Sequence, residues 1–465
     1  MSFIGLDIGT SFIKGAVLNL DSLQLEHIRR VPFPEPLAGS PPLFYEVDPL
    51  QVVSAARAFL EEMVFLAPDC QGVVLCTQMH GLVLATKTGR PRSNAITWQD
   101  QRALLPHPAG GGTYFDRLSA QLTAEEKGQL GHELKPSLPL CYLVYLKEVG
   151  QLPDAELIPA SLADFVLANL SQATPTIDLT NAASHGAINL ETLSWHRGVI
   201  EKLGLAHLNW PQIRAPGEVA YHLTINGKSL PVYPPIGDHQ CAILGACLEG
   251  DELSLNVATA SQVTALAPGL RPGAYQTRPF FEGRFLNTIA RIPAGRSLNV
   301  LVDLLCELPR ANKQPIPDPW DYIVEAAAAT EQTTLQVDLS FFASSVGDRG
   351  SIANIGEDNL TVGHLFRAAF QNMAGNYLAC ARRLIPQGGA EPHQVWRRLV
   401  FSGGLAQKIE PLRALICRTF QLDSRLSASA EDTLLGLLAL ALVITGRAES
   451  TEAATTLVGE RMKQD

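Results

Sequence analysis

Two similar hairpin-like segments, one in each half of the chain, constrain the fold most strongly. The first, residues 3–18, has an apolar run, a turn that contains Asp7 and Gly9, and a second apolar run. Residues 253–266 repeat this order around a small turn that contains Thr259. Because an isolated Asp-x-Gly-Thr motif also occurs in ordinary β-hairpins, the repetition is the more informative observation. It predicts a duplicated domain whose two copies close on one ligand.

The turn of the first segment suits a polyphosphate with its magnesium ion. Gly9, Thr10 and Ser11 offer backbone N–H groups and hydroxyls, which are common donors to phosphate oxygens. Asp7 supplies a short carboxylate that can face Mg²⁺, directly or through water. We therefore interpret this turn as the first phosphate clamp of a kinase, and we include Lys14 among its nucleotide-binding residues.

Length and patterning indicate an α/β protein of two domains. The chain has 465 residues, of which 46% are hydrophobic, and this length exceeds one ordinary core. Asp48 followed by Pro49 predicts the start of a helix, and the apolar run at 72–76 then predicts a buried strand. Farther on, Thr361 is expected to cap a long helix that ends near Leu384.

Charge and cysteine usage exclude several classes of partner. The net charge is -10 and no block of five Lys or Arg residues occurs, which argues against nucleic acid. The 8 cysteines lack Cys-x-x-Cys spacing, so we expect reduced thiols and no zinc site. The first predicted strand leaves no room for a signal peptide, and the longest apolar run, 434–445, falls short of the roughly 18 residues that cross a bilayer. We expect a soluble, cytoplasmic monomer or homodimer without a membrane partner.

Two polar segments of the first half are candidates for binding a polyhydroxylated ligand. The first follows the predicted buried strand and consists of Gln78, Met79 and His80. In the second, Trp98, Asp100 and Arg102 alternate, so an extended backbone would place all three on one face. The alternative for this second segment is a surface ion pair beside a core tryptophan.

An acid and a glycine pair later in the chain are further candidates. Asp238 lies on a glycine turn before a small-residue helix, where negative charge is stabilised, although it could serve only as a helix cap. Gly403 and Gly404 separate a predicted strand from a helix, an arrangement that lets a base or a phosphate lie against bare backbone. The small polar residues of 178–186 fit close approach to a ligand or a connecting loop equally well.

In order and spacing, these motifs resemble those of the FGGY carbohydrate kinases over nearly the whole chain. The resemblance implies two actin-like, ribonuclease H-like ATPase domains with a cleft between them. Residues 1–245 would bind the sugar and carry the first phosphate motif and the catalytic acid, and residues 246–465 would bind the nucleotide. ATP and Mg²⁺ are the implied cofactors.

The same resemblance assigns roles to individual residues. Asp238 would be the catalytic base that accepts the proton of the attacking hydroxyl, and it would also contact the sugar. The other implied sugar-binding residues are Gln78, Met79, His80, Trp98, Asp100 and Arg102. The implied nucleotide-binding residues are Gly9, Thr10, Ser11, Lys14, Thr259, Gly295, Asn299, Gly403 and Gly404, and Asp7 would be the magnesium ligand. Ala258 and Ala260 depart from the glycine and serine common around Thr259 in the family.

Within the family, residues 97–102 and 181–184 resemble the sedoheptulokinases most. This implies phosphoryl transfer from ATP to the terminal primary hydroxyl of sedoheptulose. Xylulokinases and ribulokinases share most of these features, so a pentulose is the alternative substrate. An actin-like ATPase module without a sugar substrate and an inactive sugar sensor are the alternatives from other classes. The kinase interpretation requires the carboxyl groups of Asp7 and Asp238 to share one groove.

Overall fold

The computed structural model describes residues 1–153, 156–385 and 389–462, and the chain divides into two compact units. Unit 1 contains Met1–Cys247, Thr277–Phe285 and Glu431–Asp465, and unit 2 contains Leu248–Gln276 and Leu286–Ala430. These compact units differ from a simple division at residue 245, because two later segments return to unit 1. The longer of these carries an apolar helix that packs on the sheet of unit 1, a tertiary contact that no local pattern specifies.

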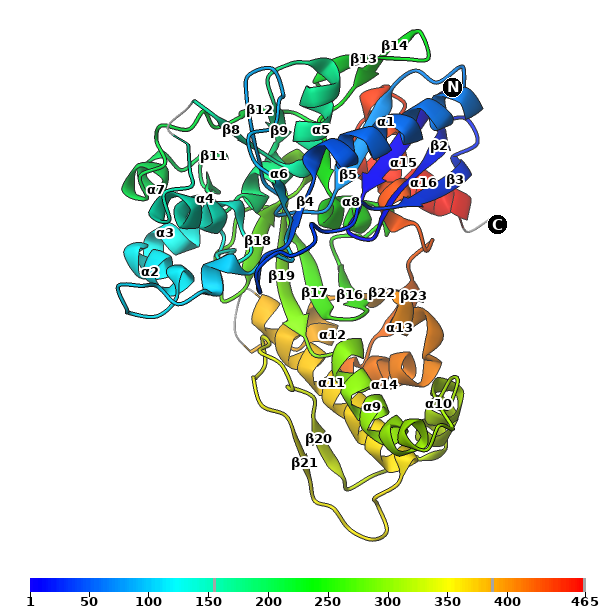
Figure 1. Ribbon diagram of the computed structural model, residues 1–465. Coiled ribbons are helices and arrows are strands. Elements are labelled where there is room, and N and C mark those ends of the chain that lie inside the picture. Colours follow the sequence, from blue (N-terminus) through cyan, green and yellow to red (C-terminus); the bar gives the residue numbers. More distant parts are fainter. Residues whose placement is uncertain (154–155, 386–388, 463–465) are drawn as a thin grey trace. The chain divides into compact units, whose positions relative to one another are not determined.

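Unit 1 is built around a mixed sheet with strand order β13-β14-β5-β1-β2-β3, and β15 pairs with the end of β5 (Figure 1). Strand β1 is buried at every position, runs antiparallel to β2 and lies parallel to β5. The strands are β1 (Ser2–Ile8), β2 (Phe12–Asn19), β3 (Gln24–Pro32), β5 (Val73–Thr77), β13 (Tyr221–Ile225), β14 (Lys228–Val232) and β15 (Ile236–Gly237).

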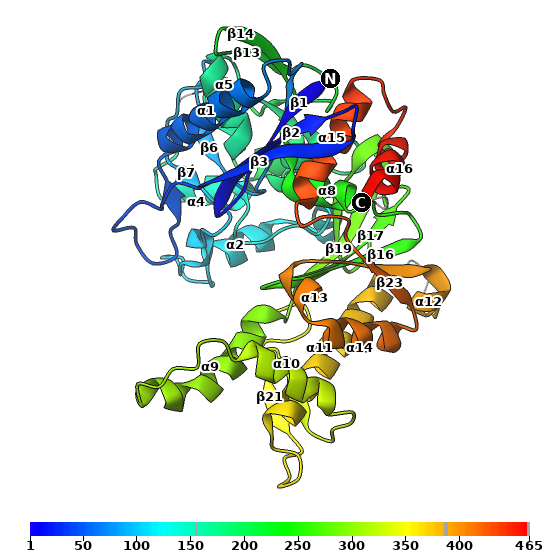
Figure 2. The same cartoon turned by 90° about the vertical axis from the view of Figure 1, so that its right-hand side faces the viewer.

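Helices cover both faces of this sheet, which explains why β1 and β5 read as unbroken apolar runs. Helices α1 (Pro49–Leu66) and α5 (Leu162–Ser171) share one hydrophobic core with the sheet, whereas α8 (Asp238–Gly245) and α15 (Asp432–Ile444) lie on the other side (Figure 2). The predicted start of α1 is confirmed, because the Asp48 side chain accepts a hydrogen bond from the Leu50 amide.

Two glycines bring α8 and α15 into close contact. A Cβ atom at Gly245 would lie 1.8 Å from the Asp432 carbonyl oxygen, and one at Gly436 would lie 2.0 Å from the Cys241 carbonyl oxygen. Neither position can therefore accept a side chain without separating the helices. This contact ties the segment at 431–465 to unit 1.

The remaining elements of unit 1 surround the sheet and form small two-stranded sheets, β4 with β7, β6 with β8, β9 with β12 and β10 with β11. They are β4 (Glu46–Val47), β6 (Val83–Ala85), β7 (Ala95–Ile96), η1 (Arg102–Leu104), α2 (Tyr114–Gln121), α3 (Ala124–Gln129), α4 (Pro139–Glu148), β8 (Ile158–Ala160), β9 (Thr176–Asp178), α6 (Leu179–Ser184), β10 (Ile188–Asn189), β11 (Ser194–Trp195), α7 (Arg197–Lys202), β12 (Gln212–Arg214), β18 (Gln276–Pro279), η2 (Phe281–Gly283) and α16 (Thr451–Met462).

Unit 2 repeats the central arrangement of unit 1. Strand β16 runs antiparallel to β17 and parallel to β22, as β1 does with β2 and β5, within the order β19-β17-β16-β22-β23. The predicted duplication of the hairpin is therefore confirmed. These strands are β16 (Glu252–Val257), β17 (Ser261–Ala267), β19 (Phe285–Ile292), β22 (Arg398–Ser402) and β23 (Asp423–Leu426).

The helices of unit 2 form its hydrophobic core with this sheet. The long helix α11 begins after its Thr361 cap and ends at Leu384, as predicted. The other elements are α9 (Gly295–Ala311), α10 (Trp320–Ala329), β20 (Gln336–Asp338), β21 (Ser351–Ala353), α11 (Val362–Leu384), α12 (Pro392–Val395), α13 (Gly404–Lys408) and α14 (Glu410–Phe420). Within the described ranges of both units, every helix is too short or too polar to span a bilayer.

Candidate active site

Three parallel strands of unit 1 end at the same edge of the sheet. The register pairs Asp7 of β1 with Cys76 of β5, and Gly237 of β15 with Thr77 of β5. Because the carboxyl ends of neighbouring parallel strands meet, this topology brings Asp7 and Asp238 to one edge although 230 residues separate them in sequence. The negative charge of Asp7 contributes to the raised pKa of Asp238, as expected for neighbouring acids.

Asp7 is a buried carboxylate with one oxygen engaged and one available. Its Oδ2 atom accepts a hydrogen bond of 2.8 Å from the Thr433 hydroxyl and lies 3.5 Å from Nζ of Lys14. Its buried Oδ1 atom has no hydrogen-bond partner among the described residues. Burial raises the pKa of Asp7, against the opposing charge of Lys14 and the Thr433 hydrogen bond. A divalent cation would supply both the missing partner and the missing positive charge, so this carboxylate fits a magnesium site.

Lys14 lies between two acids at this edge. Its ammonium group is 2.9 Å from Oε2 of Glu431, in addition to its contact with Asp7. Burial lowers the pKa of Lys14, but the charges of Asp7 and Glu431 outweigh it and leave that pKa above its ordinary value. Lys14 therefore stays protonated at neutral pH and balances part of the acidic charge.

Asp238 is the first residue of α8 and has the electrostatics of a proton acceptor. Its Oδ1 atom accepts a hydrogen bond of 2.8 Å from the amide of His239. Burial, reinforced by the charge of Asp7, raises the pKa of Asp238 to about 7. A carboxylate with a pKa near the working pH can both take up and release a proton. The N-cap of α8 is Gly237 and has no side-chain capping bond, so Asp238 lies one residue after the position of a helix cap, the alternative role that the sequence left open.

The predicted phosphate turn is connected to two of the predicted sugar-binding residues. The hydroxyl of Thr10 accepts a hydrogen bond of 2.9 Å from the Trp98 indole, and Gln78 donates one of 3.2 Å to the carbonyl of Gly9. Ser11 contributes its carbonyl oxygen to the amide of Phe33. The structure therefore brings Gly9, Thr10, Gln78 and Trp98 together.

The segment from Trp98 to Arg102 does not form the predicted extended face. Its strand ends at Ile96, a turn follows, and Arg102 begins the short helix η1. Asp100 and Arg102 are fully buried, and Asp100 accepts three hydrogen bonds from Arg102 and one from the Tyr45 amide. Trp98, at 42% exposure, is the residue of this segment that faces outward.

The buried ion pair is therefore part of the scaffold beneath Trp98. A second acid, Glu46, lies 2.6 Å from the Arg102 guanidinium, which also stacks 4.3 Å above the Phe44 ring. The alternative of a surface ion pair beside a core tryptophan is also wrong, because the ion pair is in the core and Trp98 is at the surface.

His80 is partly buried and lies in a positively charged environment. It has a left-handed backbone with a φ of 67°, and its Nε2 atom lacks a hydrogen-bond partner within the described part of the chain. Burial lowers the pKa of His80 well below its ordinary value, and the charges of Lys135 and Arg278 add to this effect. His80 is therefore neutral at pH 7. The guanidinium of Arg278 forms a buried ion pair with Glu133 and a hydrogen bond of 2.8 Å with Nδ1 of His239.

Unit 2 brings three of its predicted nucleotide-binding residues together. The hairpin turn that contains Thr259 accepts two hydrogen bonds from the first residues of α9, including one of 3.1 Å from the Gly295 amide. Gly403 has a φ of 88°, and a Cβ atom there would lie 2.6 Å from the Val257 carbonyl oxygen. The backbone of this loop thus passes directly beside the β16 end of the hairpin. Asn299 lies one helical turn after Gly295.

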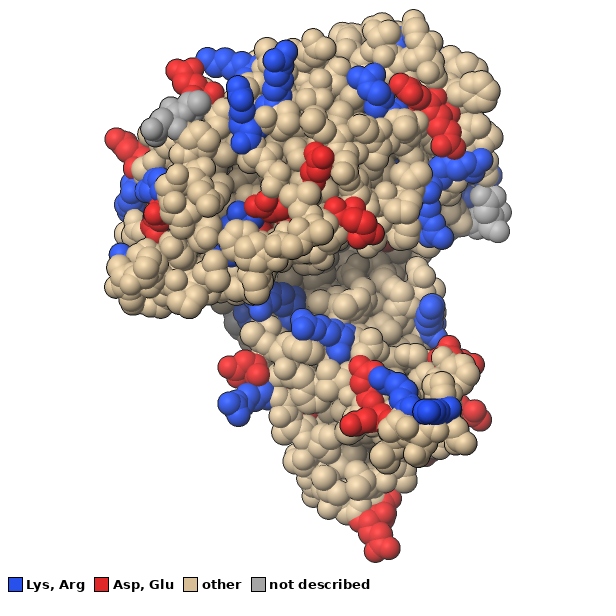
Figure 3. Space-filling model, viewed as in Figure 1, with Lys and Arg blue, Asp and Glu red and all other residues tan. Residues whose placement is uncertain are grey.

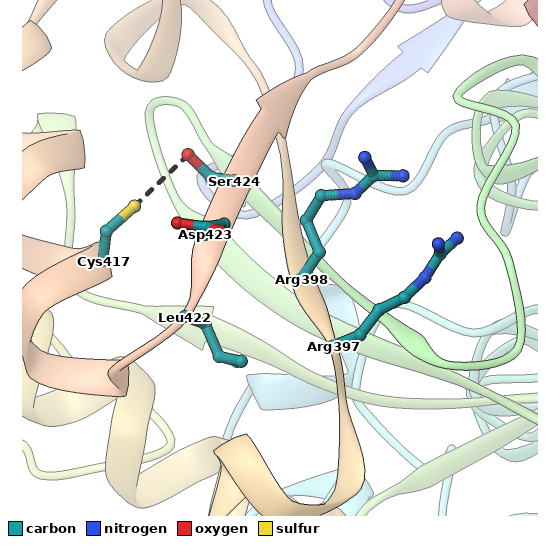
Figure 4. A pocket seen from close by; sticks show the side chains of 6 residues that line it. All are labelled: Arg397, Arg398, Cys417, Leu422, Asp423 and Ser424. Atoms are coloured by element: carbon teal, nitrogen blue, oxygen red, sulfur yellow. Dashed lines mark hydrogen bonds between the residues drawn. The ribbon is translucent and has the colours of Figure 1, made fainter.

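A separate cavity opens elsewhere in unit 2, at the amino end of β22. It has a volume of about 630 Å³ and is lined by Arg397, Arg398, Cys417, Leu422, Asp423 and Ser424 (Figure 4). The Cys417 thiol donates a hydrogen bond of 3.2 Å to the Ser424 hydroxyl. None of the predicted site residues lines this cavity, and Gly403 follows the opposite end of β22.

Several residues at the edge of the sheet in unit 1 escaped the sequence reasoning. Glu431 and Thr433 belong to none of the predicted motifs, yet they contact Lys14 and Asp7. Arg278 and Glu133 had no motif around them. The sequence did contain a signal for Glu431 and Thr433, because they are polar residues at the start of an apolar helix. Nothing in the local sequence indicated that this helix packs in unit 1.

On the face of unit 1 shown in Figure 3, acidic and basic side chains of the described residues are interspersed.

The fold defines the class of protein. The xylulose kinase of Rhodospirillum rubrum has a TM-score of 0.83 at 17% identity, covering 100% of this chain and 97% of that one. The glycerol kinase of Plasmodium falciparum, solved with ADP, has a TM-score of 0.82 at 17% identity, covering 98% and 92%. The chain thus has the two-domain, actin-like and ribonuclease H-like fold of sugar kinases.

Sequence comparison then gives the family. The model of the N-terminal domain of the FGGY family of carbohydrate kinases matches residues 2–245. The chain belongs to the FGGY family of carbohydrate kinases, as the sequence motifs predicted.

Curated relatives agree with this assignment. A sedoheptulokinase from Mus musculus is 24% identical over 471 residues, which cover 90% of this chain and 92% of the relative. The sedoheptulokinase of Homo sapiens is also 24% identical, over 90% and 93% of the two chains. A glycerol kinase from Streptomyces avermitilis is 29% identical over 50% of this chain and 46% of its own.

Proposed function

We propose that this carbohydrate kinase transfers the γ-phosphoryl group of ATP to the terminal primary hydroxyl of sedoheptulose. One observation carries the chemical part of the proposal. Asp238 is a partly buried acid with a pKa raised to about 7, and it directly follows β15, which β5 separates from the strand β1 that carries Asp7. Phosphoryl transfer needs a base for the attacking hydroxyl and a cation beside the phosphates, and these two acids are suited to those separate tasks.

Asp238 would accept the proton of the attacking hydroxyl. Its carboxylate must come within about 3 Å of that hydroxyl in the reactive complex. Because burial disfavours its charge, the ionised form is a stronger base than an exposed aspartate would be. Neutral His80 and half-exposed Trp98 would help to orient the sugar, and the tryptophan ring offers a flat apolar face to a carbon backbone.

Asp7 would hold the magnesium ion, which neutralises charge on the transferring phosphates when it is bound. No group of three His, Cys, Asp or Glu residues suited to a metal occurs in the ranges that the structure describes. Asp7 would therefore contribute one carboxylate and leave the other positions to phosphate oxygens and water, which is the usual arrangement for Mg²⁺.

Each unit carries a hairpin with residues proposed to contact the nucleotide. Thr10 and Ser11 of the first hairpin and Thr259 of the second would hold phosphate oxygens. Gly403 and Gly404 would line the adenosine pocket, since the loop has no side chains that block close approach. Ala258 and Ala260 replace a glycine and a serine of the family pattern. They leave the phosphate contact of the second hairpin to backbone groups and to Thr259.

Sedoheptulose is proposed on two grounds. Residues 97–102 and 181–184 resemble the corresponding segments of sedoheptulokinases. The relatives that bear this name match along 90% of the chain, whereas the glycerol kinases of higher identity match about half of it. A seven-carbon ketose has a terminal primary hydroxyl, as the proposed transfer requires.

A substrate panel tests the proposal. Purified protein is mixed with MgATP and sedoheptulose, xylulose, ribulose or glycerol, and ADP release is measured by a coupled assay. The product phosphate ester is identified by phosphorus NMR. We expect the highest kcat/KM with sedoheptulose and a kcat about 100- to 10,000-fold lower in Asp238→Asn, which serves as the control for contaminating kinases.

Each other result has a defined meaning. A higher kcat/KM with xylulose or ribulose would replace sedoheptulose but keep the reaction. ATP hydrolysis that no sugar accelerates would refute the proposed transfer and favour an ATPase module. Absence of ATP binding would favour a sugar sensor.

A further inference from the structure

Helix α6 of unit 1 holds two loops of the candidate active site through its side chains. The Thr180 hydroxyl accepts a hydrogen bond of 2.9 Å from the Gly237 amide, and the Asn181 amide group donates one of 2.7 Å to the Pro235 carbonyl. One turn later, the Ser184 hydroxyl accepts a hydrogen bond of 3.4 Å from the backbone of His80. The loop that leads to Asp238 and the turn that contains His80 are thus both attached to this one short helix.

The Thr180 hydroxyl has a fixed direction. It donates its only proton to Oδ1 of Asp178, the N-cap of α6, which also accepts a hydrogen bond of 2.7 Å from the Thr180 amide. The hydroxyl lone pair is therefore left to accept from Gly237. Asp178 and Thr180 are buried, at 1% and 3% exposure, so water does not compete for these bonds.

Gly237 is restrained on several sides. Strand β5 pairs with β15 through Thr77, and α6 contributes the Thr180 hydroxyl from another direction. A Cβ atom at Gly237 would lie 2.6 Å from Oε1 of Gln240 and 3.3 Å from the Met79 side chain. A backbone held this tightly fixes the direction in which the next residue, Asp238, presents its carboxylate.

We propose that Thr180 is a positioning residue for the base: through the Gly237 amide, its hydroxyl holds the Asp238 carboxylate in the geometry that accepts the substrate proton. The inference rests on the proposed role of Asp238. Its physical basis is that a shift of about 1 Å in a reacting group can cost on the order of 100-fold in rate. Loss of the hydroxyl would leave the Gly237 amide buried without its partner and free this loop to shift.

Two substitutions and a matched control test the proposal. Thr180→Val removes the hydroxyl at nearly constant volume, and Thr180→Ser keeps the hydroxyl but removes a methyl group. Thr176→Val removes another buried hydroxyl from the adjoining strand, one that contacts Tyr221 at 3.3 Å. We expect Thr180→Val to lower kcat by about 10- to 100-fold with the KM for MgATP within about twofold. Thr180→Ser should retain most of kcat, and Thr176→Val should leave kcat unchanged.

A titration that needs no turnover separates this inference from the proposed function. Aspartate labelled with ¹³C at the carboxyl carbon reports each titration by NMR, and Asp238→Asn assigns the signal. In Thr180→Val the looser loop admits water, so the pKa of Asp238 should fall from about 7 toward its ordinary value. The wild type and Thr176→Val should keep the raised pKa.

The outcomes decide between positioning and bulk stability. Unchanged kcat and an unchanged Asp238 titration in folded Thr180→Val would overturn the proposal, as would equal losses in Thr180→Val and Thr176→Val. If Thr180→Val does not fold, Thr180→Ala repeats the test, and failure of both to fold would assign Thr180 a structural role instead. If no sugar is phosphorylated by the wild type, the proposed function fails, while the titration still tests Thr180.

Discussion

Asp238→Asn should remove activity and stabilise the protein above neutral pH. The folded-state pKa of Asp238 is raised from 3.8 to about 7. The folded protein therefore holds this proton more tightly than the unfolded chain, and the free energy of unfolding falls as pH rises from about 4 to about 7. One pH unit is worth about 1.4 kcal/mol, so ionised Asp238 costs up to about 4 kcal/mol at pH 8. Asparagine has no such cost.

The assay compares melting temperatures of wild type and variant at pH 5 and pH 8. We expect the variant to gain little at pH 5 and several degrees at pH 8, while kcat falls by about 100- to 10,000-fold. Asp69→Asn, at an exposed position of unit 1, is the control and should shift neither quantity. Equal changes in melting temperature at the two pH values would refute the raised pKa of Asp238, and retained kcat would refute its role as base.

Three other substitutions separate binding from scaffold. Trp98→Ala removes a half-exposed ring, so the KM for the sugar should rise about tenfold or more in steady-state kinetics with little loss of stability. Arg102→Met leaves the buried Asp100 carboxylate unpaired and should lower the free energy of unfolding by about 3–5 kcal/mol in urea titrations; an unchanged midpoint would contradict this scaffold role. Gly403→Ala places a Cβ atom 2.6 Å from the Val257 carbonyl oxygen, so calorimetry should show weaker ATP binding while the sugar affinity is kept.

The sequence predicted features whose signals are local. The hairpin at 3–18 and its repeat at 253–266 are visible as apolar runs around small turns, and both form the expected strands. Asp48 and Thr361 cap the expected helices because capping depends on the neighbouring backbone amides alone. Family membership was also readable, since the order and spacing of motifs are properties of the chain itself.

Other predictions failed where long-range contacts outweigh local pattern. Alternation from Trp98 to Arg102 predicted one extended face, but the pairing of Arg102 with Asp100 and Glu46 closes the segment into a turn. The composition of 178–186 fits ligand contact and a connecting loop equally well, whereas in the structure this segment contains helix α6, which holds the approach to Asp238.

The sequence alone determined the identity of the acids, the duplicated hairpin and the family, because these follow from residue types and their order. Only the tertiary structure decided that Asp7 and Asp238 meet at one sheet edge, and that Glu431 and Thr433 return to it. The physical reason is that parallel strand pairing and burial set which charges are neighbours. The raised pKa of Asp238 arises from that environment and from no motif.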